Sequence, residues 1–141
     1  AARAGRLAHW LDGPDGALAL VIVLDQLPLN MYRGDALAYA SGGQALAAAR
    51  HALAHGHDRL LAQDRIAFLF LPFMHSEDLA DQDRSVALFG AAGLADGLRW
   101  AEHHRDLIRR FGRFPHRNEA LGRPSTPEEL AYLASPRAFK G

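Results

Sequence analysis

The sequence contains no cysteine, and its 141 residues include a single lysine, Lys140. The absence of cysteine excludes disulfide bonds and every metal site built on thiolates. A chain without disulfides is compatible with a reducing compartment, so we expect a cytoplasmic protein. Because arginine carries nearly all of the positive charge, the position of an arginine is more informative than the number of arginines.

Long apolar runs, net charge and metal-ligand motifs are also missing. No segment approaches the roughly 20 apolar residues of a membrane-spanning helix, and the chain does not begin with a signal-peptide pattern. Sixteen basic and sixteen acidic residues cancel, so a nucleic acid or a membrane surface is not an expected partner. The chain has no HExxH motif and no glycine-rich phosphate loop. We therefore predict no metal and no cofactor.

Charge is nevertheless distributed unevenly along the chain. Residues 58–83 hold six acidic residues and two arginines, whereas residues 99–123 hold seven arginines and three acidic residues. Two explanations are open. The two segments can neutralise each other across a helix interface, or each can supply one wall of a polar site.

Helical patterns dominate the chain. Apolar or small residues recur at helical spacing in residues 44–55 and 95–111, and residues 17–27 are almost wholly apolar. Thr126-Pro127-Glu128-Glu129 is typical of a helix start with a capping box. Further helices are expected at residues 4–11, 34–39, 63–75 and 79–92. We expect Pro28 and its neighbours to end the helix at residues 17–27, and Pro72 to kink the helix at residues 63–75 or to mark its last turn. These patterns predict an all-α fold of stacked antiparallel helix pairs, forming a single domain over residues 1–141.

One polar cluster, His75-Ser76-Glu77-Asp78, directly follows the apolar run 66–74. A carboxylate near His75 can fix the tautomer of the imidazole, so His75 with Glu77 is a candidate catalytic acid–base pair. Alternatively, Glu77 and Asp78 only occupy the start of the next helix, where carboxylates are favoured. The second explanation suits Asp78 better than Glu77.

A second cluster follows the long helix at residues 95–111. Gly112 and Pro115 interrupt the chain, and the loop presents Arg113, His116, Arg117 and Asn118. The planar fork of arginine suits carboxylate and phosphate, so these four residues are candidate ligand-binding residues. The arginines can equally pair with the acidic segment.

Two further groups of polar residues lie on apolar helices. His104 falls on the apolar stripe of residues 95–111, where an inward histidine is either a hydrogen-bonded core residue or a ligand-binding residue. Asp25, Asn30 and Arg33 lie at the end of the apolar segment 17–27 or just beyond it. Asp25 must be hydrogen-bonded if it is buried, and Asn30 and Arg33 are natural partners for helix-terminal carbonyls. These three residues are also candidate ligand-binding residues.

The order of these motifs resembles the bacterial domain of unknown function 924 family. The matching segments are Leu24-Asp25-Gln26…Asn30-Met31-Tyr32-Arg33-Gly34, Phe68-Leu69-Phe70-Leu71-Pro72…His75-Ser76-Glu77-Asp78 and Arg110-Phe111-Gly112-Arg113-Phe114-Pro115-His116-Arg117-Asn118. The resemblance extends over about residues 17–133. It implies an all-α, tetratricopeptide-like fold and no particular activity.

The chain departs from the family pattern in two places. The first motif typically reads Pro-Arg-Asn where this chain has Pro28-Leu29-Asn30. The family's N-terminal stretch looks absent or shortened here.

Two functions are compatible with these residues. In one, a polar groove between helices binds a small anionic ligand or an acidic peptide end; the enzyme version of this function is a metal-free hydrolase that uses His75 with Glu77. In the other, the protein is a helical scaffold that binds a protein segment, and the polar motifs only hold helix ends together. Side chains paired with each other favour the scaffold, whereas spare donors lining a cavity favour the ligand site.

Overall fold

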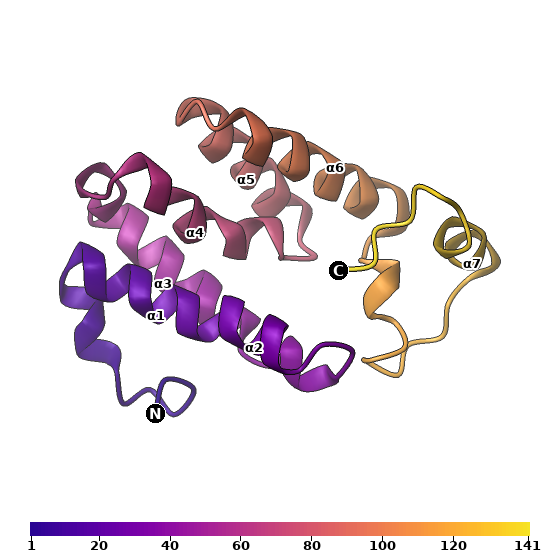
Figure 1. Ribbon diagram of the computed structural model, residues 1–141, viewed down its shortest axis with the longest axis horizontal. Helices are drawn as coiled ribbons and strands as arrows, with labels where there is room; N and C mark the ends of the chain where they lie inside the picture. Colours follow the sequence, from indigo (N-terminus) through magenta and orange to yellow (C-terminus); the bar gives the residue numbers. More distant parts are fainter.

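All of the regular structure is helical, and Figure 1 shows how the helices follow one another. The computed structural model describes residues 1–141. The α-helices (α) and 3-10 helices (η), in chain order, are η1 (Ala8–Asp12), α1 (Pro14–Leu24), α2 (Gln26–Met31), η2 (Ala36–Ala38), α3 (Gly42–Ala54), η3 (His57–Leu60), α4 (Gln63–Met74), α5 (Leu79–Ala91), α6 (Ala95–Phe111), η4 (Pro115–Arg117) and α7 (Pro127–Leu133). No strand is present, so the predicted all-α fold is confirmed.

The main apolar core lies between α1, α3 and α4, with single contributions from α5 and α6. Helix α3 supplies only alanines to its fully buried part, namely Ala45, Ala48, Ala49 and Ala52. Small side chains on α3 leave room for the leucines of α1 and the phenylalanines of α4. Gly97 has the same effect in α6, because a Cβ atom there would lie 2.3 Å from the ring of Phe89 in α5.

A smaller apolar cluster joins the C-terminal elements to α6. It consists of Leu107 and Ile108 of α6, Phe114 before η4 and Tyr132 of α7. Figure 1 shows these elements beyond the C-terminal end of α6, and the chain returns from α7 toward the ends of α4 and α6. This arrangement brings the loop around η4 to the ends of helices from the first half of the chain.

Most predicted helix ends are confirmed, because they depend on local interactions. Asp78 begins α5 by accepting hydrogen bonds from the N–H groups of Ala80 and Asp81. Gly112 ends α6 in the left-handed conformation, with a φ of 71°. Thr126 and Glu129 form both hydrogen bonds of the capping box at the start of α7.

Two expectations about the N-terminal part were wrong. The segment 4–11 is not one α-helix, because Gly5 adopts a φ of 72° and only the 3-10 helix η1 follows it. Pro28 does not end the second helix. The chain bends at Asp25, and α2 then continues nearly in line with α1, with Pro28 in its first turn (Figure 1).

Ser41 compensates for the hydrogen bond that Pro28 cannot make. In a continuous helix the carbonyl of Leu24 would accept the N–H of residue 28, and proline has none. The Ser41 hydroxyl donates to that carbonyl instead, at 2.6 Å. Ser41 is only 1% exposed, so this hydrogen bond is shielded from water.

None of the helices combines the length and the apolarity that crossing a bilayer requires.

We predict that Ser41→Ala destabilises the protein by about 1–3 kcal/mol, because it leaves the buried Leu24 carbonyl without a partner. Ser85→Ala is the matched control: Ser85 is also fully buried, but its hydroxyl has no hydrogen-bond partner. Urea denaturation of both variants measures the difference. Equal losses of stability in the two variants would contradict the assigned role of Ser41.

Candidate functional site

Polar motifs at the ends of apolar helices need mutual partners, so we expected the clusters around residues 75–78 and 113–118 to meet in space, and they do. The Arg117 guanidinium donates to the carbonyl of His75 at 2.8 Å. The backbone N–H of Phe114 donates to the Glu77 carboxylate, also at 2.8 Å. The loop that follows α6 is therefore attached to the chain segment between α4 and α5.

Glu77 is held by this loop and does not contact His75. Arg123 forms a forked ion pair with Glu77, with N–O distances of 2.7 and 2.9 Å. Burial alone would raise the pKa of Glu77, but the hydrogen bonds from Arg123 and Phe114 and the nearby charge of Arg117 lower it below its usual range. The expected His75–Glu77 pair is therefore not formed. Two residues of separation at the end of α4 do not bring the side chains together.

A second ion pair, between Arg113 and Glu129, ties the same loop to α7. Glu129 is 2% exposed and accepts two hydrogen bonds from Arg113, at 2.8 and 2.9 Å. Asn118 also donates to Glu129, at 3.1 Å, and accepts from Arg123 at 3.0 Å. Hydrogen bonding by Arg113 lowers the pKa of Glu129 from 4.5 to about 2. Arg113 and Asn118 were expected to bind a ligand, but both side chains are engaged in holding the loop together.

The carboxylate that contacts His75 is Asp25. The Nδ1 atom of His75 lies 2.8 Å from one Asp25 oxygen and 3.1 Å from the other. The Gln26 amide also donates to Asp25, at 2.6 Å. Asp25 is 4% exposed at the bend between α1 and α2, so its predicted need for hydrogen bonds is met.

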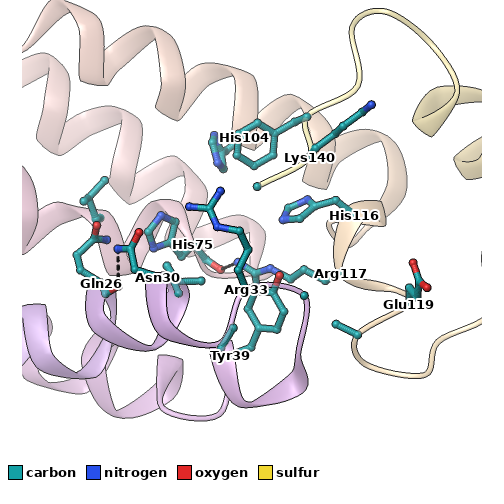
Figure 2. A pocket seen from close by; sticks show the side chains of 17 residues that line it. Gln26, Asn30, Arg33, Tyr39, His75, His104, His116, Arg117, Glu119 and Lys140 are labelled. Atoms are coloured by element: carbon teal, nitrogen blue, oxygen red, sulfur yellow. Dashed lines mark hydrogen bonds between the residues drawn. The ribbon is translucent and has the colours of Figure 1, made fainter.

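A cavity of about 440 Å³ lies next to His75, which forms part of its lining. Its lining comes from α2, η2, the C-terminal end of α4, the middle of α6, η4 and the last residues of the chain (Figure 2). The predicted site residues among this lining are Asn30, Arg33, His75, His104, His116 and Arg117. Figure 2 shows the Arg33 side chain extending into the cavity. Glu77, Arg113 and Asn118 do not line it.

Arg117 has no carboxylate partner although it is half-buried. Its guanidinium lies 4.6 Å from the ring centre of Tyr39 and 4.6 Å from that of Phe114. No carboxylate lies within ion-pair distance, and its Nε atom is buried without a hydrogen-bond partner. Burial lowers the pKa of this guanidinium, and the nearby Glu77 charge opposes that effect. Arg117 therefore brings unneutralised positive charge to the cavity wall.

His104 is buried and hydrogen-bonded, as predicted. It is 5% exposed, and its Nδ1 atom lies 2.7 Å from the Trp100 carbonyl. Burial lowers its pKa from 6.5 to about 3, so the ring is neutral at pH 7. Because a carbonyl only accepts, Nδ1 carries the proton and Nε2 keeps a lone pair.

The remaining predicted residues of the cavity lining are His116, Asn30 and Arg33. The His116 ring is neutral at pH 7, like that of His104. Burial, followed by the charge of Arg117, lowers the pKa of His116 from 6.5 to about 4. Asn30 donates to the Gln26 carbonyl at 2.8 Å, which is the helix-terminal role expected of it. Arg33 is exposed and donates no hydrogen bond to a helix-terminal carbonyl, so the contact expected of it is not present.

Two cavity residues and one supporting residue were missed by the sequence reasoning. Gln26 and Tyr39 line the cavity, and Arg123 holds Glu77 away from it. Leu29, where the family pattern typically has arginine, lines the cavity with an apolar side chain. Gln26 belonged to a quoted motif and Arg123 to the arginine-rich segment 99–123, so both could have been included. Tyr39 lay outside them, and no pattern in the sequence marked it.

Pairing between the acidic and the basic segment is confirmed at several points. Arg105 and Arg109 both contact Asp83 at 3.5 Å, and Arg123 pairs with Glu77. No group of three or more histidine and carboxylate side chains is placed so that it could hold a metal ion. Three arginines of the basic segment therefore pair with the acidic segment, whereas Arg117 has no ion-pair partner.

Comparison with known proteins identifies the family. The family model described as bacterial protein of unknown function (DUF924) matches residues 1–137, so the chain belongs to this family. A solved structure of a protein of unknown function from Agrobacterium tumefaciens is 46% identical and superposes with a TM-score of 0.92. The match covers 95% of this chain and 76% of that chain. The comparison with curated proteins gave no match.

We predict that Glu129 makes stability depend on acid pH. Its pKa in the folded protein, about 2, is below the ordinary 4.5, so its contribution is fully present above about pH 4.5 and is lost as the pH falls toward 2. Glu129→Gln should therefore lower the thermal unfolding midpoint at pH 7 and approach the parent protein at pH 2. Glu128→Gln is the control, because Glu128 is exposed and pairs with the exposed Arg110. Parallel curves for the parent protein and Glu129→Gln from pH 7 to pH 2 would contradict this assignment.

Proposed function

We propose that the cavity binds a small organic anion. The observation that carries this proposal is that Arg117 faces the cavity without a carboxylate partner. The two nearest carboxylates already have partners, since Glu77 pairs with Arg123 and Asp25 with His75. A guanidinium removed from water is stabilised by an anion, so a bound carboxylate or phosphate would supply the charge that the protein does not.

The charge of the lining as a whole supports an anion. The cationic side chains of the lining are Arg33, Arg117 and Lys140, and its one acidic side chain is Glu119. Figure 2 shows Glu119 and Lys140 at the edge of the cavity, whereas Arg33 and Arg117 lie near the histidines. His104 and His116 add no positive charge at pH 7. The anionic group of a ligand is therefore expected between Arg33 and Arg117.

His104 indicates a second feature of the ligand. Its Nε2 lone pair is an acceptor that no group of the protein satisfies, and the ring lines the cavity. A ligand hydroxyl or amino group can donate to this atom. The favoured ligand class is a small anion that also carries a hydrogen-bond donor, such as a hydroxy acid. A cavity of about 440 Å³ is in the range of small-molecule sites.

The alternative is a non-enzymatic scaffold with a tetratricopeptide-like arrangement that binds a protein segment. The paired side chains of Arg113, Asn118 and Glu129 are what this alternative predicts. The free donors of Arg33 and Arg117 are not, because a scaffold has no need for unpaired cations beside a cavity. An acidic peptide end presents the same carboxylate chemistry, so a peptide is tested by the same variants.

We predict opposite effects from the same substitution at two arginines of one loop. Arg117→Met keeps apolar contact with Tyr39 and Phe114 and removes an unpaired charge, so the unfolding free energy of the free protein should change by no more than about 1 kcal/mol. Binding of succinate and inorganic phosphate should weaken roughly 10- to 100-fold, since a hydrogen bond to a charged group contributes about 1.5–3 kcal/mol. Calorimetry and urea denaturation measure the two quantities.

Arg113→Met is the matched control. It removes the partner of the buried Glu129, so the unfolding midpoint should fall while succinate binding by the folded fraction stays unchanged. If neither succinate nor phosphate binds the parent protein, or if Arg117→Met binds them equally well, the proposed anion site is wrong. A marked loss of stability in Arg117→Met would favour the scaffold.

We also predict that malate binds more tightly than succinate, because its hydroxyl can donate to His104. The gain should be roughly 2- to 10-fold, which corresponds to a neutral hydrogen bond of about 0.5–1.5 kcal/mol. His104→Asn should abolish the preference, because the asparagine amide can replace Nδ1 at the Trp100 carbonyl but offers no acceptor at the Nε2 position. A malate-to-succinate ratio that His104→Asn leaves unchanged would exclude this role.

A further inference from the structure

We propose that His75, aligned by Asp25, is a general base that activates water for hydrolysis of an ester of the bound anion. The proposal rests on the anion site described above and adds a reaction to it. It differs from the pairing expected from the sequence, because the carboxylate is Asp25 of the α1–α2 bend and not Glu77.

The tautomer of His75 follows from its contacts. An ionised carboxylate only accepts hydrogen bonds, so the Nδ1 atom, at 2.8 Å from Asp25, carries a proton. The Nε2 atom makes no hydrogen bond within the protein, and the imidazole lines the cavity. In the neutral ring the lone pair of Nε2 therefore has no partner in the protein. A buried carboxylate behind a histidine also stabilises the imidazolium that forms when Nε2 takes a proton.

Both partners of this dyad are held in position. Gln26 donates to the second oxygen of Asp25, which fixes the plane of the carboxylate. The backbone N–H of His75 donates to the Leu71 carbonyl at 2.9 Å, and its own carbonyl accepts from Arg117. The same Arg117 that is proposed to bind the anion is thus hydrogen-bonded to the residue that carries the base. Such support keeps a reacting group in a productive orientation.

Water is the nucleophile that the lining leaves available. No serine, threonine or cysteine lines the cavity. Ser76, beside His75 in the sequence, donates to Asp81 at 2.7 Å and is engaged at the start of α5. Tyr39 supplies the one side-chain hydroxyl, and its ring is stacked against Arg117. Nucleophilic attack by Tyr39 is a separate outcome that one variant can exclude.

The reaction proceeds in two steps. First, the water oxygen forms a bond to the ester carbonyl carbon, the carbonyl π electrons move to oxygen, and His75 Nε2 takes the proton of the water. Then the tetrahedral intermediate re-forms the carbonyl, the bond to the alcohol oxygen breaks, and His75 returns its proton to that oxygen. The products are an alcohol and a carboxylic acid, which releases a proton to solvent. No oxidant, reductant or further reactant is needed.

The test compares two activated esters with the same leaving group. Mono(4-nitrophenyl) succinate carries a carboxylate, and 4-nitrophenyl butyrate is its neutral analogue. We expect kcat/KM for the anionic ester to exceed that for the neutral ester at least tenfold. His75→Asn should lower it roughly 100-fold or more, the range of general-base catalysis. The asparagine amide can still donate to Asp25, so this variant retains the structural contact.

Three controls separate the base from other effects. His55→Ala removes an exposed imidazole far from the cavity lining and should leave the rate unchanged, which accounts for non-specific ester cleavage by histidine. Tyr39→Phe keeps the ring that contacts Arg117 and removes only the hydroxyl, so it tests whether Tyr39 is the nucleophile. In His75→Ala, added imidazole should restore part of the activity, which a purely structural role would not allow. Loss of activity in Tyr39→Phe would overturn water as the nucleophile.

Binding of succinate, measured separately, distinguishes the two proposals. If succinate binds but the anionic ester is not preferred, or if His75→Asn hydrolyses it like the parent protein, the general base is wrong and the anion site stands. If succinate and phosphate do not bind, the anion site itself is wrong. Circular dichroism of each variant confirms that a lost rate is not lost folding.

Discussion

The ion pair between Glu77 and Arg123 is the interaction on which the rest of the site depends. Glu77 follows the C-terminal end of α4, and it also accepts the N–H of Phe114, so one carboxylate holds both ends of the loop 114–123. Phe114 is fully buried and packs with Leu107 and Ile108 of α6. With these points fixed, η4 lies against the end of α4 and Arg117 reaches the His75 carbonyl. Without them, the cavity would lose one of its walls.

The pattern of pairing explains why the cavity is cationic. Three buried or half-buried carboxylates lie near the loop, and each has a partner of its own: Glu77 pairs with Arg123, Glu129 pairs with Arg113, and Asp25 is hydrogen-bonded to His75. Arg117 is the additional cation, and aromatic rings on two sides replace a carboxylate as its neighbours. Such contacts are weaker than an ion pair and leave guanidinium donors free. The charge that remains is therefore concentrated at one place on the cavity wall.

The sequence predicted local structure well and long-range partners poorly. The ends of α5, α6 and α7 were predictable because Asp78, Gly112 and Thr126 act within one helical turn. The partner of His75 was not, because proximity in sequence favoured Glu77, whereas Asp25 lies 50 residues away. Arg113 and Arg117 looked equivalent in the sequence. Only the positions of Glu129 and Tyr39 in space make one of them an anchor and the other a free cation.

The contrast between these two arginines also bears on the choice between a scaffold and a ligand site. If the polar motifs served only to join helix ends, a neutral residue at position 117 would fill the same space between Tyr39 and Phe114 without the cost of desolvating a charge. The chain instead places a guanidinium there, supports it with a backbone carbonyl, and surrounds it with neutral histidines. An arrangement that retains an unpaired, half-buried cation beside a cavity is stabilised when an anion binds, because binding completes the missing ion pair. The ion pairs of the loop thus hold the loop rigid, and the rigid loop positions the unpaired Arg117 at the cavity.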